Sequence, residues 1–309
     1  MSKPITITTA PCCWGVDDVS NPHLPAWQQV LEEASGAGFG GLELGPFGYL
    51  PLDLDAVGSA LDNHGLRVVA GTIFDDLVSP SNRENLLRQT DDICALITRL
   101  PTPAHHDGQR FKAPYLTVMD WGHDERDFAA GHSARAPRLD DVAWSEMVRN
   151  IRAIAELARD NYGVRAVIHP HAGGYIEFQD EIERIVSDIP VGVAGLCLDT
   201  GHLAYSGMDP VTALRRYWDR LDYIHFKDID SAVYEHVMGK CIRFFDACAE
   251  GVMCPIGRGS VDYPAIRDLL GELGYAGYIT IEQERDPRNR GSILDDLRAS
   301  RTFLRETGF

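Results

Sequence analysis

The chain has 309 residues, of which 44% are hydrophobic, and its formal charge is −17, from 46 acidic and 29 basic residues. This length is ample for one large core, and α/β barrels routinely occupy it as a single domain. The negative charge repels nucleic acid and anionic membrane surfaces, which excludes a general DNA-binding role. We therefore expect one domain over residues 1–309, with no nucleic acid and no membrane among its partners.

The cysteines and the N-terminus indicate the compartment. The seven cysteines form no Cys-x-x-Cys pair and mostly lie in apolar runs, which favours reduced thiols. Residues 1–9 lack the apolar core of a signal peptide, and no run approaches the roughly 20 apolar residues of a membrane span. We predict a cytoplasmic protein. The sequence leaves open whether it forms a homo-oligomer.

Eight short apolar runs are predicted as strands, at residues 5–10, 40–45, 66–73, 115–120, 165–170, 195–200, 223–228 and 278–283. Amphipathic stretches predicted as helices lie between them, at residues 27–37, 54–64, 83–99, 144–161, 179–187, 210–220, 263–273 and 294–306. Eight strands alternating with eight helices predict a (β/α)₈ TIM barrel. The alternative is an open doubly wound sheet, but no Gly-x-Gly-x-x-Gly turn follows the first strand.

Three connections are longer than usual, at residues 100–114, 121–141 and 230–260. The second and third follow strands four and seven, so they belong to the face of a barrel where active sites form. We expect these two connections to act as lids or substrate walls. The connection 100–114 precedes strand four and should cover the opposite face.

Residues that bind metals or move protons stand at the ends of the last four strands. They are His169 and His171 after strand five, Asp199 and His202 after strand six, His225 and Lys227 in strand seven, and Glu282 in strand eight. The carboxyl ends of barrel strands point to one common site. The sequence therefore predicts that these side chains converge.

The pattern of side chains at these strand ends favours a divalent metal ion bound by some of them. Asp199 supplies a hard oxygen ligand, although it could also serve as the N-cap of the following helix. Strand alternation points His225 and Lys227 toward the barrel axis, where a buried lysine needs an anionic partner. Glu282 is also predicted to face inward, and a buried glutamate needs a cation.

Further candidates come from other parts of the chain. A fourth metal ligand could come from His169 or from Glu177, which follows a glycine-rich turn and equally suits the N-terminus of the next helix. Candidate substrate contacts are Trp14, Glu43, His169, Asp120 and Arg258. Trp14 could instead pack in the core, and the Gly-Arg-Gly around Arg258 is too short to indicate a phosphate loop.

Several motifs together resemble a known family. They are LELG, IHPH, CLDTGH, YIHFKD, CPIGRGSVDY and TIEQE, which are spread over nearly the whole chain. The sequence resembles the xylose-isomerase-like barrels of the sugar phosphate isomerase/epimerase superfamily, and within it the myo-inosose (2-keto-myo-inositol) dehydratases. The DTGH and HFKD motifs are widespread in that superfamily, whereas HPH combined with GRGSVDY is more particular to the dehydratase branch.

The resemblance implies one divalent metal ion, manganese or cobalt first and magnesium or zinc as alternatives. Asp199, His225 and Glu282 match family ligands. Strand five departs from the pattern, because many epimerases have a glutamate where this chain has His169. We therefore predict Glu177 as the fourth ligand, with His169 as the alternative.

The resemblance also predicts a metal-dependent lyase that dehydrates 2-keto-myo-inositol or a similar keto-sugar through an enediolate. Glu282 or His171 is the candidate base, and His202 or Lys227 the candidate acid. A keto-sugar isomerase or epimerase, or a β-eliminating lyase of 3-keto-glycosides, would use the same metal site. Two further alternatives are a DNA-repair phosphodiesterase of the endonuclease-four type, which the charge disfavours, and a non-catalytic sugar-binding protein.

Overall fold

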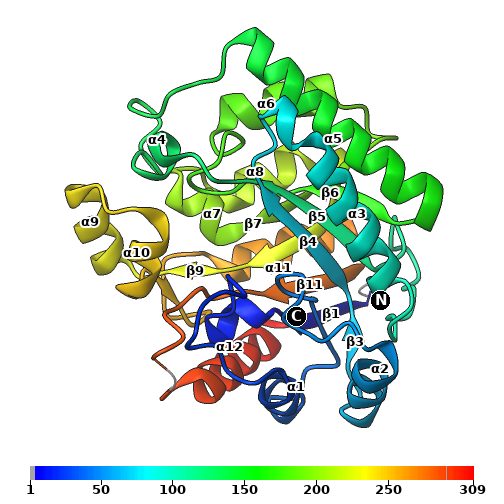
Figure 1. Ribbon diagram of the computed structural model, residues 1–309. Helices are drawn as coiled ribbons and strands as arrows, with labels where there is room; N and C mark the ends of the chain where they lie inside the picture. Colours follow the sequence, from blue (N-terminus) through cyan, green and yellow to red (C-terminus); the bar gives the residue numbers. More distant parts are fainter. Residues whose placement is uncertain (1–3, 290) are drawn as a thin grey trace.

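A ring of parallel strands forms the centre of the protein in a computed structural model that describes residues 4–289 and 291–309 (Figure 1). The sheet has nine strands in the order β3-β2-β1-β11-β8-β7-β6-β5-β4. Their bounds are Ile5–Thr9 (β1), Gly41–Leu42 (β2), Arg67–Val68 (β3), Ala70–Asp75 (β4), Tyr115–Asp120 (β5), Arg165–Ile168 (β6), Gly195–Asp199 (β7), Leu221–Phe226 (β8) and Gly277–Ile281 (β11).

The two ends of this sheet belong to one continuous segment of chain. Only Val69 separates β3 from β4, and together they cover the predicted strand 66–73. The Val69 N–H donates to the Leu42 carbonyl at 2.9 Å, and its carbonyl accepts from the Tyr115 N–H at 3.0 Å. The sheet thus closes around Val69, and the predicted (β/α)₈ barrel is confirmed.

All eight predicted helices are present, with small shifts at their ends. They are Trp27–Gly36 (α1), Leu54–Asn63 (α2), Arg83–Ile97 (α3), Asp141–Tyr162 (α5), Gln179–Asp188 (α6), Pro210–Arg216 (α8), Tyr263–Leu273 (α11) and Ile293–Thr307 (α12). Short helices that the sequence pattern did not reveal occupy the connections: Asp124–Asp127 (α4), Thr200–Tyr205 (α7), Ser231–Lys240 (α9) and Phe244–Ala249 (α10). Among the described residues, no helix combines the length and the apolar character that crossing a membrane would require.

The connection 100–114 covers the amino-terminal end of the barrel, as predicted. His106 Nε2 lies 3.1 Å from the Thr6 hydroxyl, at the start of β1. The Tyr278 hydroxyl, near the start of β11, donates to the Ala104 carbonyl at 2.5 Å. This end of the barrel interior is filled by an apolar cluster that includes Tyr115 and Tyr223, whose rings stack at 4.9 Å. Side chains therefore pack the amino-terminal end of the barrel interior.

The connection after β8 forms a separate lobe beside the open end, visible at the left of Figure 1. A short antiparallel ribbon, β9 (Asp228–Ile229) with β10 (Met253–Cys254), encloses α9 and α10. These helices share a small apolar core that contains Tyr205, Val237 and Phe244. The predicted long loop is thus an ordered wall, and it carries the aromatic pair Phe244 and Phe245 toward the strand ends.

Asp228 connects this lobe to the rest of the barrel. Its side chain is fully buried and accepts hydrogen bonds from the N–H groups of Ile229, Gly257, Gly259 and Val261 at 2.8–3.0 Å. A carboxylate at this point satisfies four donors of an irregular loop that would otherwise be unpaired. The GRGS segment therefore wraps around an internal carboxylate.

We expect Asp228→Ala to lower the free energy of unfolding by about 2–4 kcal/mol, because it leaves several buried donors without an acceptor. Asp230→Ala is the matched control, since Asp230 only caps α9 through the N–H groups of Ala232 and Val233. Loss of this helix cap should lower the free energy of unfolding by about 1 kcal/mol. Urea denaturation followed by circular dichroism measures both, and equal losses would show that Asp228 has no special role.

Candidate active site

Four side chains from successive strands meet at the open end of the barrel. His169 follows β6, Asp199 ends β7, His225 lies in β8 and Glu282 follows β11. One donor atom from each lies within 4.8 Å of the donor atoms of the other three. His225 Nδ1 is 2.8 Å from Glu282 Oε2 and 3.1 Å from His169 Nε2, and His169 Nε2 is 3.8 Å from Asp199 Oδ2. We call these four residues the tetrad.

The donor set of the tetrad fits a divalent metal ion. Two imidazole nitrogens and two carboxylate oxygens are a common composition for such sites. Only Glu282 is measurably exposed, with 12% of its side chain accessible. The buried Nδ1 of His169 has no hydrogen-bond partner among the described residues, and its Nε2 is the nitrogen that faces the tetrad. Carboxylates and imidazoles packed this closely require a cation or bound protons.

His225 is oriented by a carboxylate on its far side. Its Nε2 lies 2.7 Å from Glu43 Oε1, which also accepts from the Tyr223 hydroxyl at 2.8 Å. Because the Nε2 proton faces Glu43, Nδ1 can turn a lone pair toward the tetrad. Burial alone would lower the pKa of His225, but Cys197, Glu282 and Glu43 raise it well above the ordinary range, so a metal ion that binds Nδ1 would displace a proton from it. Glu43, predicted as a substrate contact, therefore positions a tetrad residue.

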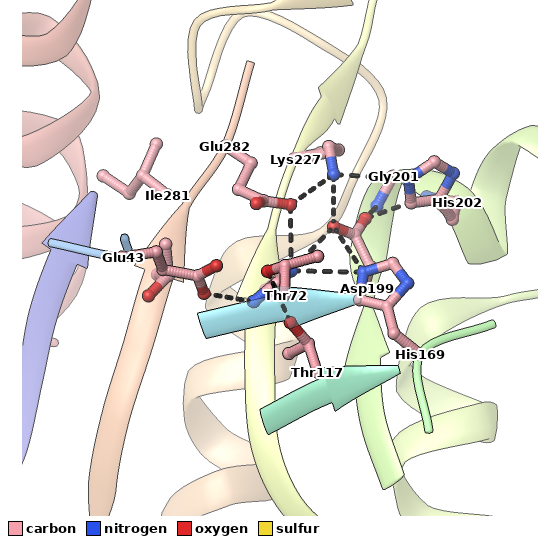
Figure 2. Close-up of polar contacts among 12 residues, drawn as sticks. Glu43, Thr72, Thr117, His169, Asp199, Gly201, His202, Lys227, Ile281 and Glu282 are labelled. Carbon is pink, nitrogen blue, oxygen red and sulfur yellow. Dashed lines mark hydrogen bonds and ion pairs between the residues drawn. The ribbon is translucent and has the colours of Figure 1, made fainter. Parts of the chain in front are cut away.

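Lys227 lies beside the tetrad and contacts three carboxylates, two of which, Asp199 and Glu282, are shown in Figure 2. Its ammonium nitrogen is 2.9 Å from Asp199, 2.5 Å from Glu282 and 2.9 Å from Glu284. Burial opposes the charge, yet these carboxylates raise the pKa of Lys227 well above its usual value. The residue thus holds its proton, which disfavours the predicted role as a proton donor. Gly201 permits this packing, because a Cβ there would lie 2.3 Å from Lys227 Cβ.

His171 and His202 lie together next to this lysine, with ring centroids 4.0 Å apart. The Ala172 N–H donates to His202 Nδ1 at 3.2 Å, and His202 Nε2 lies 3.2 Å from the Lys227 ammonium nitrogen. His171 Nδ1 lies 2.9 Å from the Ala172 carbonyl and must donate to it, which leaves a lone pair on its Nε2. Burial lowers the pKa of both histidines well below the ordinary value, so both rings are neutral.

A cavity of about 380 Å³ opens above these groups, a volume in the range of small-molecule sites. We call it the inner cavity. Its polar lining includes Asp17, Glu43, Thr72, His171, Lys227, Glu282 and Glu284, and its apolar lining includes Phe47, Phe74, Met119 and Phe245. A second space of about 680 Å³, the outer cavity, shares Asp17, Pro46, Phe74 and Phe245 with it and is also lined by Trp121 and Asp246. The connections after β5 and β8 thus form walls, as predicted.

Glu177 lies apart from the tetrad, which changes the predicted ligand set. Its carboxylate accepts hydrogen bonds from the N–H groups of Gly131 and Gly173 and from the Ser206 hydroxyl, and it pairs with the buried Arg126 at 3.3 Å. Burial raises the pKa of Glu177 to about 7 although Arg126 lowers it. Glu177 therefore joins three segments of the wall, and the structure brings the alternative, His169, to the fourth position.

Three predicted substrate contacts have structural partners instead. Trp14 is buried in the core and donates from Nε1 to Glu33 at 2.6 Å. Asp120 accepts from the N–H groups of Leu77 and Tyr175 and holds two loops together. Arg258 is 65% exposed and lies 3.8 Å from Asp296. None of the three lines either cavity, since burial or outward orientation turns each one away.

Two acidic residues of the inner cavity, Asp17 and Glu284, were missed by the sequence analysis. Glu284 follows Thr280 and Glu282 at the period of two of a strand, so the alternation that identified Glu282 also points Glu284 inward. Asp17 follows a short 3₁₀ helix at Pro11–Trp14, and no sequence pattern marks it. Burial and the carboxylates of Glu284 and Glu282 raise the pKa of Asp17 well above its usual value.

Comparisons with known proteins give relatives over the full length of the chain. Inosose dehydratase from Clostridium beijerinckii is 26% identical over 313 residues, covering 100% of this chain and 99% of that protein. The rhizopine catabolism protein MocC from Rhizobium meliloti is 30% identical over 286 residues, covering 92% and 82%. These two relatives and the further inosose dehydratases that the chain matches indicate that it is an enzyme.

Solved structures share the same barrel. The probable 3-DHS dehydratase AsbF from Bacillus anthracis has a TM-score of 0.69 at 17% identity, covering 97% of this chain and 98% of that one. The IOLI protein with a bound zinc atom has a TM-score of 0.71 at 12% identity, covering 98% and 97%. The family model of the xylose isomerase-like TIM barrel matches residues 31–307. The chain therefore belongs to the xylose isomerase-like TIM barrel family.

Proposed function

We propose that this enzyme is a divalent-metal-dependent hydro-lyase that removes water from 2-keto-myo-inositol or a similar cyclic keto-polyol. Support comes from the relatives named inosose dehydratase and from the site. The observation that carries the proposal is the position of the tetrad, whose Glu282 lines the inner cavity beside His171, a neutral histidine with a free lone pair. These are the parts needed to remove a proton next to a ketone.

The tetrad of His169, Asp199, His225 and Glu282 would hold the ion, and we propose manganese or cobalt, with zinc and magnesium as alternatives. A divalent ion bound there would act as a Lewis acid that stabilises negative charge on the ketone oxygen. Glu282 then serves as a ligand. Burial raises its pKa, but His225 and Lys227 lower it well below the usual value, so this carboxylate stays ionised.

His171 Nε2 is the proposed base, because it carries the free lone pair of a neutral ring that lines the inner cavity. It would take the proton from the carbon beside the ketone. The same nitrogen would then return that proton to the β-hydroxyl as its C–O bond breaks and the C=C bond forms. Water leaves, and the ring returns to its starting state.

His202 is a proposed positioning residue. It packs on His171 and does not line the inner cavity, and its Nδ1 holds the Ala172 peptide whose carbonyl accepts the His171 proton. Lys227 would keep a constant positive charge between the carboxylates of Asp199, Glu282 and Glu284.

We expect Glu43→Ala to weaken divalent-metal binding by about 10- to 100-fold, because the carboxylate that orients His225 is lost. Tyr223→Phe is the matched control, since it removes one hydrogen bond to Glu43 and leaves the Glu43–His225 contact intact. Tyr223→Phe should weaken divalent-metal binding by less than about 3-fold. Competition with a chromophoric chelator measures both affinities. Unchanged affinity in Glu43→Ala would contradict this positioning role.

We expect metal-loaded protein to convert 2-keto-myo-inositol into an absorbing dione or enone. His171→Gln should lower kcat by about 10²- to 10⁴-fold, the usual contribution of a general base, while the content of bound metal stays the same. Absorbance and product analysis check the reaction, and dialysis against chelator should abolish it. An epimeric ketone without a chromophore would instead support the isomerase or epimerase alternative.

A further inference from the structure

One side of the inner cavity is formed by residues of β4 and α3. Thr72 and Phe74 come from β4, and Asn85 and Gln89 come from α3. The strand β8, which carries the tetrad residue His225, is the middle strand of the sheet, whose two ends, β3 and β4, meet. Thus β4 lies across the barrel from β8, and a ring bound at the tetrad turns its far edge toward β4 and α3. We call this side of the cavity the β4–α3 wall.

The Asp75 carboxylate, at the end of β4, orients the side-chain amides of α3. Its Oδ2 accepts from Asn85 Nδ2 at 2.9 Å and from Gln89 Nε2 at 2.6 Å, and its Oδ1 accepts from Asn82 Nδ2 at 3.1 Å. Residues at this spacing share one face of a helix, which lets all three amides reach the same carboxylate. Because a carboxylate only accepts hydrogen bonds, the amide nitrogens face Asp75 and the amide oxygens are turned away from it.

Of these three amide oxygens, that of Gln89 is left for a ligand. Asn82 Oδ1 accepts from Asn85 Nδ2 at 3.0 Å, and Asn85 Oδ1 accepts from Arg88 Nη2 at 2.5 Å. Gln89 Oε1 receives no hydrogen bond from the residues that the structure describes, and its side chain lines the inner cavity. Unlike the enclosed Oε2 of Glu284, this oxygen is accessible. Gln89 therefore presents an acceptor of fixed orientation.

Thr72 presents a second acceptor. The Thr117 hydroxyl donates to the Gly71 carbonyl at 3.0 Å, so the Thr72 hydroxyl, 2.6 Å from it, must donate to Thr117 (Figure 2). The single hydrogen of the Thr72 hydroxyl is thereby used within the protein, and its oxygen keeps a lone pair for the cavity. Thr117 is fully buried and pairs with Thr72 in the register of β4 and β5. The Thr72 oxygen is thus held by the sheet itself.

We propose that Gln89 and Thr72 determine specificity, and that their side-chain oxygens each accept a hydrogen bond from a different ring hydroxyl at the edge of the substrate away from the tetrad. The enzyme then selects a ring that carries both hydroxyls over a ring in which hydrogen replaces either one. A ligand that fills the cavity excludes water, so an acceptor that the ligand leaves unpaired weakens binding. The inference rests on the proposed function only in that the ligand is a cyclic polyol.

Binding in the presence of manganese ions tests this wall independently of turnover. The probes are myo-inositol and the panel of its monodeoxy analogues, none of which carries the ketone needed for elimination. Isothermal titration calorimetry should show at least two of the analogues binding about 10-fold more weakly than myo-inositol, because each leaves one acceptor of the β4–α3 wall unpaired.

Variants assign each hydroxyl to its acceptor. Gln89→Met removes the amide oxygen from a side chain of similar length. It should weaken myo-inositol binding about 10-fold, while the affinity for one monodeoxy analogue stays within about 3-fold of that of the unaltered protein. Thr72→Val removes the hydroxyl and keeps the shape, and it should spare a different analogue in the same way. Loss of a hydroxyl that binds the metal ion would be spared by neither variant.

Two matched controls separate recognition from loosening of the wall. Asn82→Ala also removes an amide donor to Asp75, but Asn82 lines neither cavity. Thr117→Val breaks the same hydroxyl pair as Thr72→Val from its fully buried side. Both controls should keep the preference for myo-inositol over the two analogues.

The proposal is overturned if the unaltered protein shows no preference for myo-inositol over any monodeoxy analogue, a result that needs no variant to fold. It is also overturned if Gln89→Met gives the same pattern of affinities as Asn82→Ala, or Thr72→Val the same pattern as Thr117→Val. Dehydration of 2-keto-myo-inositol without this discrimination would reject the role of the wall and keep the proposed function. Discrimination that maps onto Gln89 and Thr72 without turnover of any keto-polyol would do the reverse.

Discussion

The buried Lys227 ammonium is the interaction on which the site depends. Three carboxylates from β7 and from the segment after β11 point to one place, and without a cation their mutual repulsion in a dry environment would force them apart or protonate them. Lys227 keeps Asp199 and Glu282 ionised beside the two histidines of the tetrad. A metal-type donor set and a fixed positive charge can then occupy neighbouring positions in one small volume.

Residues below and beside the tetrad hold it in place. Glu43 fixes the orientation of His225, and Tyr223 and Thr280 continue the hydrogen bonds toward Thr8 at 2.7 Å. Beneath them, stacked tyrosines and the connection 100–114 close the barrel. The groups that meet a ligand are thus held by a rigid floor, a condition for catalytic geometry that does not relax when charge develops.

The walls come from connections that vary in length without disturbing the strands. Arg126 and Glu177 bury an ion pair that joins the segment after β5 to the turn after β6, and Asp228 holds the segment that follows β10. Phe74, Trp121 and Phe245 form an aromatic border between the inner and outer cavities. An apolar border opposite a carboxylate-rich wall suits a ring with one face of C–H bonds and an edge of polar substituents.

The sequence alone determined the barrel, because apolar runs at strand length and helical periodicity are local properties that recur eight times. It also determined that His169, Asp199, His225 and Glu282 reach one end, since parallel strands in a closed ring share that end. Only the tertiary structure placed His169, and not Glu177, beside the other three side chains, because the turn after β6 takes its path from contacts with Arg126 and Gly131, which lie far away in sequence. The tertiary structure likewise decided where the side chains of Trp14, Asp120 and Arg258 lie. Their side chains were assigned by position in the chain, whereas burial and hydrogen-bond partners, which no local pattern encodes, direct them elsewhere.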